Sequence, residues 1–214
     1  MSFSLDDKTR SSSNCFGGRR EAEDCLLIIF GGSGDLAKRK LFPSLSNLFM
    51  KKQMPKRFRV LAVGRKAMST EDLLSMGKYS DEFRKNFVYI QADYSPAGIE
   101  KLKKACDEIC AESQIPPNYL HYLAVPPEGY ASLAKALADG GLVHPPKGDN
   151  WSRLVVEKPY GRDLASAIEL DDNLLSGFAE KQIYRIDHYL GKEDRKSTRL
   201  NSSHSDRSRM PSSA

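Results

Sequence analysis

The sequence has no long hydrophobic run. None of its apolar stretches approaches the roughly 18 residues needed to cross a bilayer, and residues 1–24 are polar, without the apolar centre of a secretory signal. Cysteine is also scarce, with four among 214 residues, too few for a disulfide framework. These absences predict a soluble, cytoplasmic protein with reduced thiols and no membrane partner.

Along most of the chain, positive and negative charges nearly cancel. The formal net charge is +5, but residues 195–214 carry +4 of it, from five cations and one aspartate. This Ser/Arg-rich segment lacks apolar periodicity, so we interpret it as a disordered, non-native tail, and residues 1–24 as a disordered leader. Binding of nucleic acid by such a tail is the less favoured alternative, and we predict no nucleic-acid partner.

A metal site would need more ligands than the sequence brings together. Cys106 and Cys110 are four residues apart and can share one helix face, but no histidine or third cysteine lies near them in the sequence. We therefore predict no metal and interpret the pair as two half-buried thiols.

What the sequence does contain is an alternation of short apolar runs and longer helical patterns. This alternation predicts βαβ units, and hence one α/β domain over residues 25–194 with a doubly wound, mostly parallel sheet. Strands are expected at residues 26–30, 58–64, 86–93, 118–125 and 153–159, and helices at 96–111, 129–141 and 163–178. Pro43 interrupts the helical pattern after the first strand, which leaves open one helix or a turn followed by a helix.

The first strand runs directly into the glycine-rich stretch GGSGDLA, which from Gly32 matches G-x-G-x-x-A. Small residues here allow a tight turn and a close approach of a pyrophosphate to the amides, while a helix N-terminus favours the anion. A plain tight turn is the alternative. A nucleoside triphosphate loop would end in Gly-Lys-Ser/Thr, whereas this stretch has Gly34 and Asp35. We therefore predict a dinucleotide site.

The end of the second strand bears on which dinucleotide binds. NAD-binding domains place an acid there for the ribose 2′-hydroxyl, but this strand ends in VGRKAM, with Arg65 and Lys66. A guanidinium pairs well with a 2′-phosphate, so we predict NADP rather than NAD. The alternative is that Arg65 is only a solvated loop cation.

Two further stretches end on the same predicted rim of the sheet. Lys158 follows an apolar strand and precedes Pro159, which restricts its backbone. Tyr130 follows a Pro-Pro strand exit and is available to pack on a cofactor. If a helix begins near Asp187, the cations His188 and Lys192 lie one turn apart, an arrangement that suits a phosphate; a solvated helix face is the alternative.

Together these motifs resemble one family. GGSGDLAKRKLFPSL, VGR, YLAVPP, VVEKPYGRDL and QIYRIDHYLGKE occur in this order, and over roughly residues 25–193 the chain resembles glucose-6-phosphate dehydrogenase. The resemblance implies the Rossmann-like coenzyme domain of an oxidoreductase of the pentose phosphate pathway, which oxidises glucose 6-phosphate with NADP. It assigns the pyrophosphate to Gly31, Gly32, Ser33, Gly34, Asp35, Leu36, Ala37 and Lys38. It also assigns the 2′-phosphate to Arg65, the cofactor's flank to Tyr130, nicotinamide and sugar to Lys158, and the sugar phosphate to His188 and Lys192.

The sequence also departs from the family. Members continue into a second, β+α domain that supplies the histidine base, and we expect this chain to stop before it. Asp187 matches the carboxylate that orients this base, but none of His121, His144 and His204 stands in a similar motif. We expect cofactor binding with little or no turnover, doubtful oligomerisation and exposed apolar surface at residues 184–190. A non-catalytic NADP-binding module is the alternative.

Overall fold

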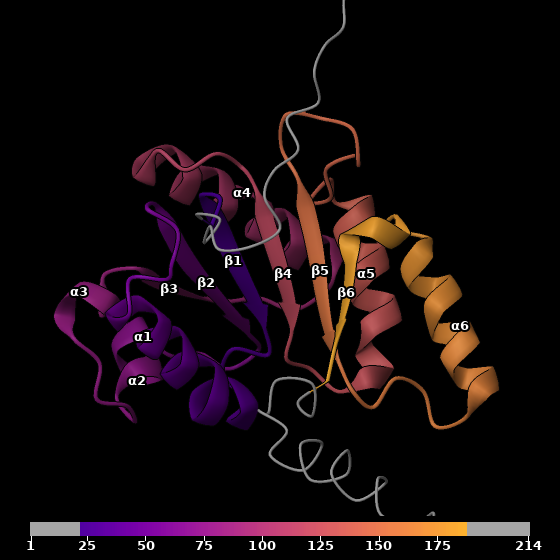
Figure 1. The fold of residues 1–214 in the computed structure, drawn as a ribbon, viewed down its shortest axis with the longest axis horizontal. Helices are drawn as coiled ribbons and strands as arrows, with labels where there is room; N and C mark the ends of the chain where they lie inside the picture. Colours follow the sequence, from indigo (N-terminus) through magenta and orange to yellow (C-terminus); the bar gives the residue numbers. More distant parts are fainter. Residues whose placement is uncertain (1–21, 188–214) are drawn as a thin grey trace, which may run out of the picture.

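The structure is a computed structural model that describes residues 22–187 (Figure 1). The predictions on most of the leader, on the tail, and on Cys15, His188, Lys192 and His204 lie outside these residues. In the described part, six parallel strands form one sheet in the order β3-β2-β1-β4-β5-β6. The strands are β1 (Cys25–Phe30), β2 (Phe58–Gly64), β3 (Phe87–Gln91), β4 (Tyr119–Leu123), β5 (Ser152–Glu157) and β6 (Ile183–Ile186). The predicted α/β fold is therefore confirmed, with an entirely parallel sheet.

Helices cover both faces of the sheet because its central strand is apolar on both. All six residues of β1 are buried. Leu27 and Ile29 pack towards η1 (Ala37–Leu41), α1 (Phe42–Met50), α2 (Thr70–Leu74) and α3 (Asp81–Arg84). Leu26 and Ile28 pack on the opposite side, towards α4 (Pro96–Ser113), α5 (Tyr130–Asp139) and α6 (Leu164–Leu175). The short turns η2 (Pro127–Gly129) and η3 (Glu180–Gln182) complete the elements.

Pro43 does not divide the first helix. The backbone is helical from residue 35 to Met50, but Ala37–Leu41 form a π-helical turn, in which the N–H of Phe42 donates to the carbonyl of Ala37. A proline inside an α-helix removes one hydrogen bond and its ring clashes with a carbonyl one turn back. The wider π turn directly before Pro43 accommodates that defect, so one continuous helical segment follows β1.

The sequence did not predict β6, nor the short helices α2 and α3. β6 is an edge strand of which only Ile183 is buried, so it has no continuous apolar run. The predicted exposure of apolar side chains near the chain's end is found at Tyr184 and Ile186, which are 46% and 36% exposed.

The thiols are more deeply placed than the sequence suggested. Cys25, Cys106 and Cys110 are free and buried, and desolvation raises the pKa of Cys25 and of Cys110 to about 11. Within residues 22–187, no cluster of three or more His, Cys, Asp or Glu side chains could hold a metal ion. No helix in that part of the chain combines the length and apolarity of a membrane span.

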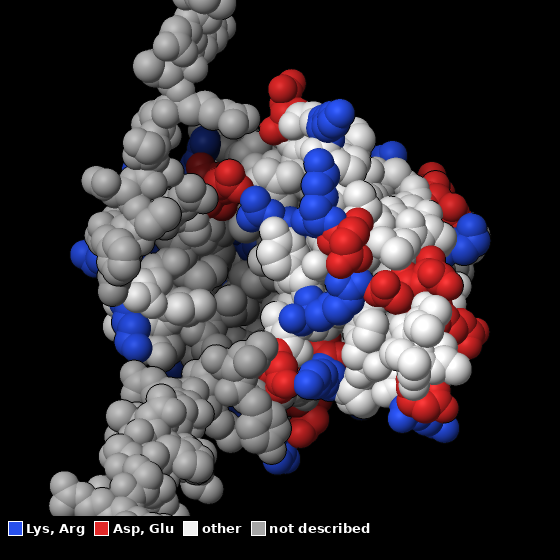
Figure 2. Space-filling model, turned by 45° about the vertical axis from the view of Figure 1, so that its right-hand side comes forward, with Lys and Arg blue, Asp and Glu red and all other residues white. Residues whose placement is uncertain are grey.

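Charged side chains are mixed on the surface. On the side of the molecule turned forward in Figure 2, lysines and arginines alternate with aspartates and glutamates and form no broad field of one sign.

Candidate functional site

The glycine turn lies where the strand order of the sheet reverses. From β1 the chain continues to β2 and β3 on one side and later to β4, β5 and β6 on the other. In open α/β sheets, ligands generally bind beyond the carboxyl ends of the strands at such a reversal, here β1 and β4. Gly31 follows β1 with a φ of +77°, and a Cβ there would lie 2.3 Å from the carbonyl oxygen of Ala124. A Cβ on Gly32 would lie 2.8 Å from the Cβ of Ala62. The turn is wedged between the ends of β2 and β4, where larger residues do not fit.

The turn leaves backbone donors at the start of a helix. The N–H of Gly34 donates to Gly31 at 2.8 Å, and the first helical bond runs from Lys38 to the carbonyl of Gly34 at 3.2 Å. The amide of Gly32 is also engaged, by the carbonyl of Val63 at 2.9 Å. The amides of the first helical turn, residues 35–37, precede the first helical bond, and Gly34 has no side chain to cap them. Asp35 points its carboxylate at Arg39, 2.7 Å away on the helix surface. Such a helix start is suited to binding an anion.

Arg65 lies beside this turn. The position that a Cβ would take on Gly64, directly before Arg65, is 2.6 Å from the hydroxyl oxygen of Ser33 and 2.7 Å from that of Tyr89. The Tyr89 hydroxyl also donates to the carbonyl of Lys66 at 2.6 Å, which fixes the chain after β2. The structure thus brings the glycine turn and Arg65 to the same edge of the sheet, because the residue directly before Arg65 lies against the turn.

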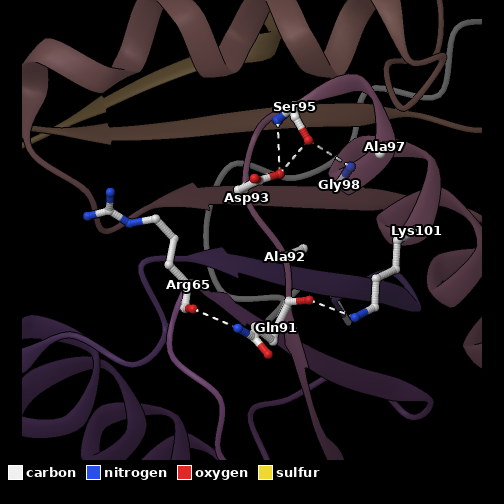
Figure 3. Close-up of a pocket in the computed structure, with 8 residues that line it drawn as sticks. All are labelled: Arg65, Gln91, Ala92, Asp93, Ser95, Ala97, Gly98 and Lys101. Carbon is white, nitrogen blue, oxygen red and sulfur yellow. Dashed lines mark hydrogen bonds between the residues drawn. The ribbon is translucent and has the colours of Figure 1, made fainter.

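A surface groove of about 490 Å³ continues from Arg65 across the end of β3 to the first turns of α4 (Figure 3). Hydrogen bonds fix its walls: Gln91 Nε2 donates to the Arg65 carbonyl at 3.0 Å, and Lys101 Nζ to the Gln91 carbonyl at 2.8 Å. The lining residues are Arg65, Gln91, Ala92, Asp93, Ser95, Ala97, Gly98 and Lys101. Apart from Arg65, none of them was singled out from the sequence. The one available signal was the D-x-S-P start of a helix, in which Ser95 caps α4.

Lys158 and Asp187, which the sequence singled out separately, meet at the far side of the same edge. The register of β5 and β6 places Glu157 beside Ile186, so the residues that follow are neighbours. Lys158 Nζ lies 2.7 Å from Asp187 Oδ2, and the Lys158–Pro159 peptide bond is cis. Asp187 therefore pairs with a lysine of this chain, a partner that the sequence did not suggest.

Tyr130 has a more buried position than a cofactor-stacking residue needs. It is 2% exposed, packs in the core, and its hydroxyl lies 3.5 Å from the carbonyl oxygen of Glu157. Burial raises the pKa of this hydroxyl. Since no more than an edge of the ring can be reached from outside, its predicted contact with the cofactor stays a prediction.

A buried acid at the same edge was missed. Glu157 is 6% exposed at the end of β5, and the Tyr122 hydroxyl of β4 donates to its Oε1. Desolvation, followed by this hydrogen bond, raises the pKa of Tyr122. The position of Glu157 directly before Lys158, at the end of an apolar run, was the signal that could have drawn attention to it.

An all-parallel sheet in this strand order, with a glycine turn at the reversal point and a helix start behind it, defines a dinucleotide-binding domain of the Rossmann type. Domains of this type bind the nicotinamide cofactor of many dehydrogenases. The sequence model of one such family, described as "Glucose-6-phosphate dehydrogenase, NAD binding domain", matches residues 28–196. The chain belongs to this oxidoreductase family, which confirms the resemblance inferred from its motifs.

Individual relatives agree. The chain is 41% identical over 178 residues to the glucose-6-phosphate 1-dehydrogenase of Bacillus subtilis, an alignment covering 78% of this chain and 36% of the relative. The Streptococcus pneumoniae protein of the same name is 38% identical over 180 residues, with the same shares covered. A solved glucose-6-phosphate dehydrogenase in complex with its substrate glucose-6-phosphate has a TM-score of 0.70 and 32% identity, over 83% of this chain and 39% of that one. The chain therefore spans little more than a third of the relatives it matches.

Proposed function

We propose that this chain is the coenzyme-binding domain of an NADP-dependent glucose-6-phosphate dehydrogenase. The whole enzyme would oxidise glucose 6-phosphate at C1 to 6-phosphoglucono-1,5-lactone. The observation that supports NADP is that Gly64, the residue before Arg65, lies against the hydroxyl of Ser33, so that Arg65 is at the same edge of the sheet as the glycine turn. A pyrophosphate bound at the turn and a ribose 2′-phosphate bound at Arg65 can then belong to one ligand.

Each part of the proposed site has a defined task. The amides between Gly31 and Lys38, other than those of Gly32 and Gly34, which donate within the chain, bind the pyrophosphate. The guanidinium of Arg65 and the hydroxyl of Ser33 bind the 2′-phosphate. Bound NADP supplies the hydride acceptor. At the other end, Asp187 holds the ammonium of Lys158 at the edge where nicotinamide and sugar would meet, 2.7 Å from its carboxylate. His188 and Lys192 are proposed to bind the sugar phosphate.

Substitution of Arg65 tests the cofactor assignment. A bidentate, charge-assisted contact is worth roughly 1.5–3 kcal/mol, so Arg65→Ala should weaken NADP binding by about one to two orders of magnitude and leave NAD binding nearly unchanged. Isothermal titration of both cofactors, with Lys135→Ala on α5 as a charge-matched control, measures the difference. Unchanged binding of both cofactors would show that Arg65 is only a solvated cation, and equal losses for NADP and NAD would show that it does not distinguish the 2′-phosphate.

One observation favours a second candidate, a non-catalytic NADP-binding module. Neither histidine in the described part lies near Asp187: His121 is completely buried with Nε2 3.0 Å from the Leu142 carbonyl, and His144 stacks on Tyr119 at the start of β4. Such a module would bind NADP without responding to glucose 6-phosphate. Titration of the sugar phosphate into the NADP-loaded chain separates the two candidates, because only the enzyme domain retains part of a sugar site.

A further inference from the structure

The groove beyond Arg65 is the place for the adenine base of the cofactor, an inference that rests on the proposed NADP site. In NADP the adenosine ribose carries both the 2′-phosphate and the base, so the base lies within one sugar ring of the phosphate. If Arg65 binds the phosphate, the groove that begins at Arg65 and ends at α4 is the space open to the base (Figure 3). Small residues, Ala92, Ala97 and Gly98, contribute to its lining and leave room for a planar ring.

Asp93 is the acidic side chain of this groove and it is held firmly. Its Oδ1 accepts hydrogen bonds from the amide of Ser95 at 3.1 Å and from the hydroxyl of Ser95 at 2.6 Å. The start of α4 lies against it, since a Cβ on Gly98 would come within 2.3 Å of the Asp93 carbonyl oxygen. The residue is exposed, so its carboxylate keeps acceptor capacity towards the groove.

The charge of Asp93 fits one kind of base. The side-chain hydrogen bond from Ser95, together with the backbone one, lowers the pKa of the Asp93 carboxyl, which is therefore ionised at neutral pH and only accepts hydrogen bonds. Adenine carries an exocyclic amine, a donor, where hypoxanthine and guanine carry a carbonyl oxygen, an acceptor. A carboxylate facing that position attracts the amine of adenine and repels the carbonyl oxygen of hypoxanthine or guanine.

We propose that Asp93 is a specificity-determining residue for the cofactor, which selects adenine by accepting a hydrogen bond from its exocyclic amine. The groove then has two charged contacts of opposite sign: Arg65 for the 2′-phosphate and Asp93 for the base. Asp93 does not take part in hydride transfer, and its proposed contact with the cofactor affects only which dinucleotide the domain binds.

The experiment compares two cofactors that differ at this position and in the proton on the neighbouring ring nitrogen N1. NADP and nicotinamide hypoxanthine dinucleotide phosphate are titrated by calorimetry into the 214-residue chain and its variants. The unchanged chain should bind NADP roughly tenfold more tightly, since one charge-assisted hydrogen bond is lost with hypoxanthine. Asp93→Asn can keep the Ser95 contacts and can donate to a carbonyl, so the ratio should fall to near one. Asp107→Asn, the same change farther along α4, should keep the full ratio.

The result is read as a ratio because loss of Asp93 also weakens the start of α4. Asp93→Ala should likewise lower the preference, and the thermal midpoint of each variant shows that it is folded. If the unchanged chain binds NADP and its hypoxanthine analogue with equal affinity, or if the ratio of the two affinities is unchanged in Asp93→Asn, the inference is overturned and the NADP assignment stands. Failure of the unchanged chain to bind NADP overturns the proposed function, and the inference with it.

Discussion

At the level of single residues, the glycine turn is the feature most sensitive to substitution. Gly31→Ala should destabilise the fold by more than ~1 kcal/mol, because its φ of +77° disfavours a side chain and the new Cβ would lie 2.3 Å from the Ala124 carbonyl oxygen. Guanidinium unfolding measures the loss. Gly148→Ala is the matched control, because its Cβ would meet nothing closer than 3.7 Å and should cost nothing. Equal midpoints for the two variants would contradict the strained geometry.

His121 gives the fold a specific dependence on pH. Desolvation, with a smaller contribution from His144, lowers its pKa from 6.5 to about 4, although the bond to the Leu142 carbonyl opposes the shift. Between these values the unfolded chain binds a proton that the folded chain does not. The stability contributed by neutral His121 is therefore complete above pH 6.5 and is lost as the pH falls towards 4.

The size of this loss is on the order of 3 kcal/mol, from the shift in pKa. His121→Gln retains a donor for Leu142 but does not titrate, so its free energy of unfolding should fall less steeply between pH 7 and pH 4.5 than that of the unchanged chain, by roughly this amount. Urea titrations at both pH values measure the difference. Parallel pH profiles would mean that other groups govern the acid sensitivity.

At the level of elements, burial decided what the sequence could predict. The predictions for β1, β2 and β5 are within two residues of the structure because these strands are mostly buried and have near-continuous apolar runs. β6 was missed because three of its four residues are exposed. Its place in the sheet depends partly on Arg185, which pairs with Asp171 and Glu180, and such contacts across the chain leave no periodic pattern.

The helix beside this edge strand has an apolar outer face. Leu164, Ile168 and Leu175 of α6 are 77%, 53% and 41% exposed, and their spacing places them on one side of the helix. An uncovered stripe of this kind favours self-association. Ile168→Lys should therefore lower the apparent mass of the chain in sedimentation at high concentration, whereas Asn173→Lys, with the same added charge on another side of α6, should not. Equal effects would attribute the association to net charge.

At the level of the whole molecule, the sequence predicted those parts of the site that lie in one continuous stretch. The glycine turn needs a strand before it and a helix after it, and all three are local. The groove with Asp93 was not predictable, because Arg65 follows β2 while Asp93 follows β3, and only the pairing of Gly64 with Gln91 brings these chain segments together. The same holds for the contact between Lys158 and Asp187, which depends on the β5–β6 register.

The positions of the histidines relative to Lys158 and Asp187 lead to a prediction about catalytic activity. The 214-residue chain should bind NADP but form little or no NADPH from glucose 6-phosphate, because neither histidine among residues 22–187, His121 or His144, lies where it could reach a hydroxyl near Lys158 and Asp187. Loss of a general base alone typically slows a reaction ~10²- to 10⁴-fold. NADPH fluorescence, with the Bacillus subtilis relative as the positive control, measures the rate. Turnover within tenfold of that relative would require a base among the residues of this chain, and substitution of each of its histidines would then identify it.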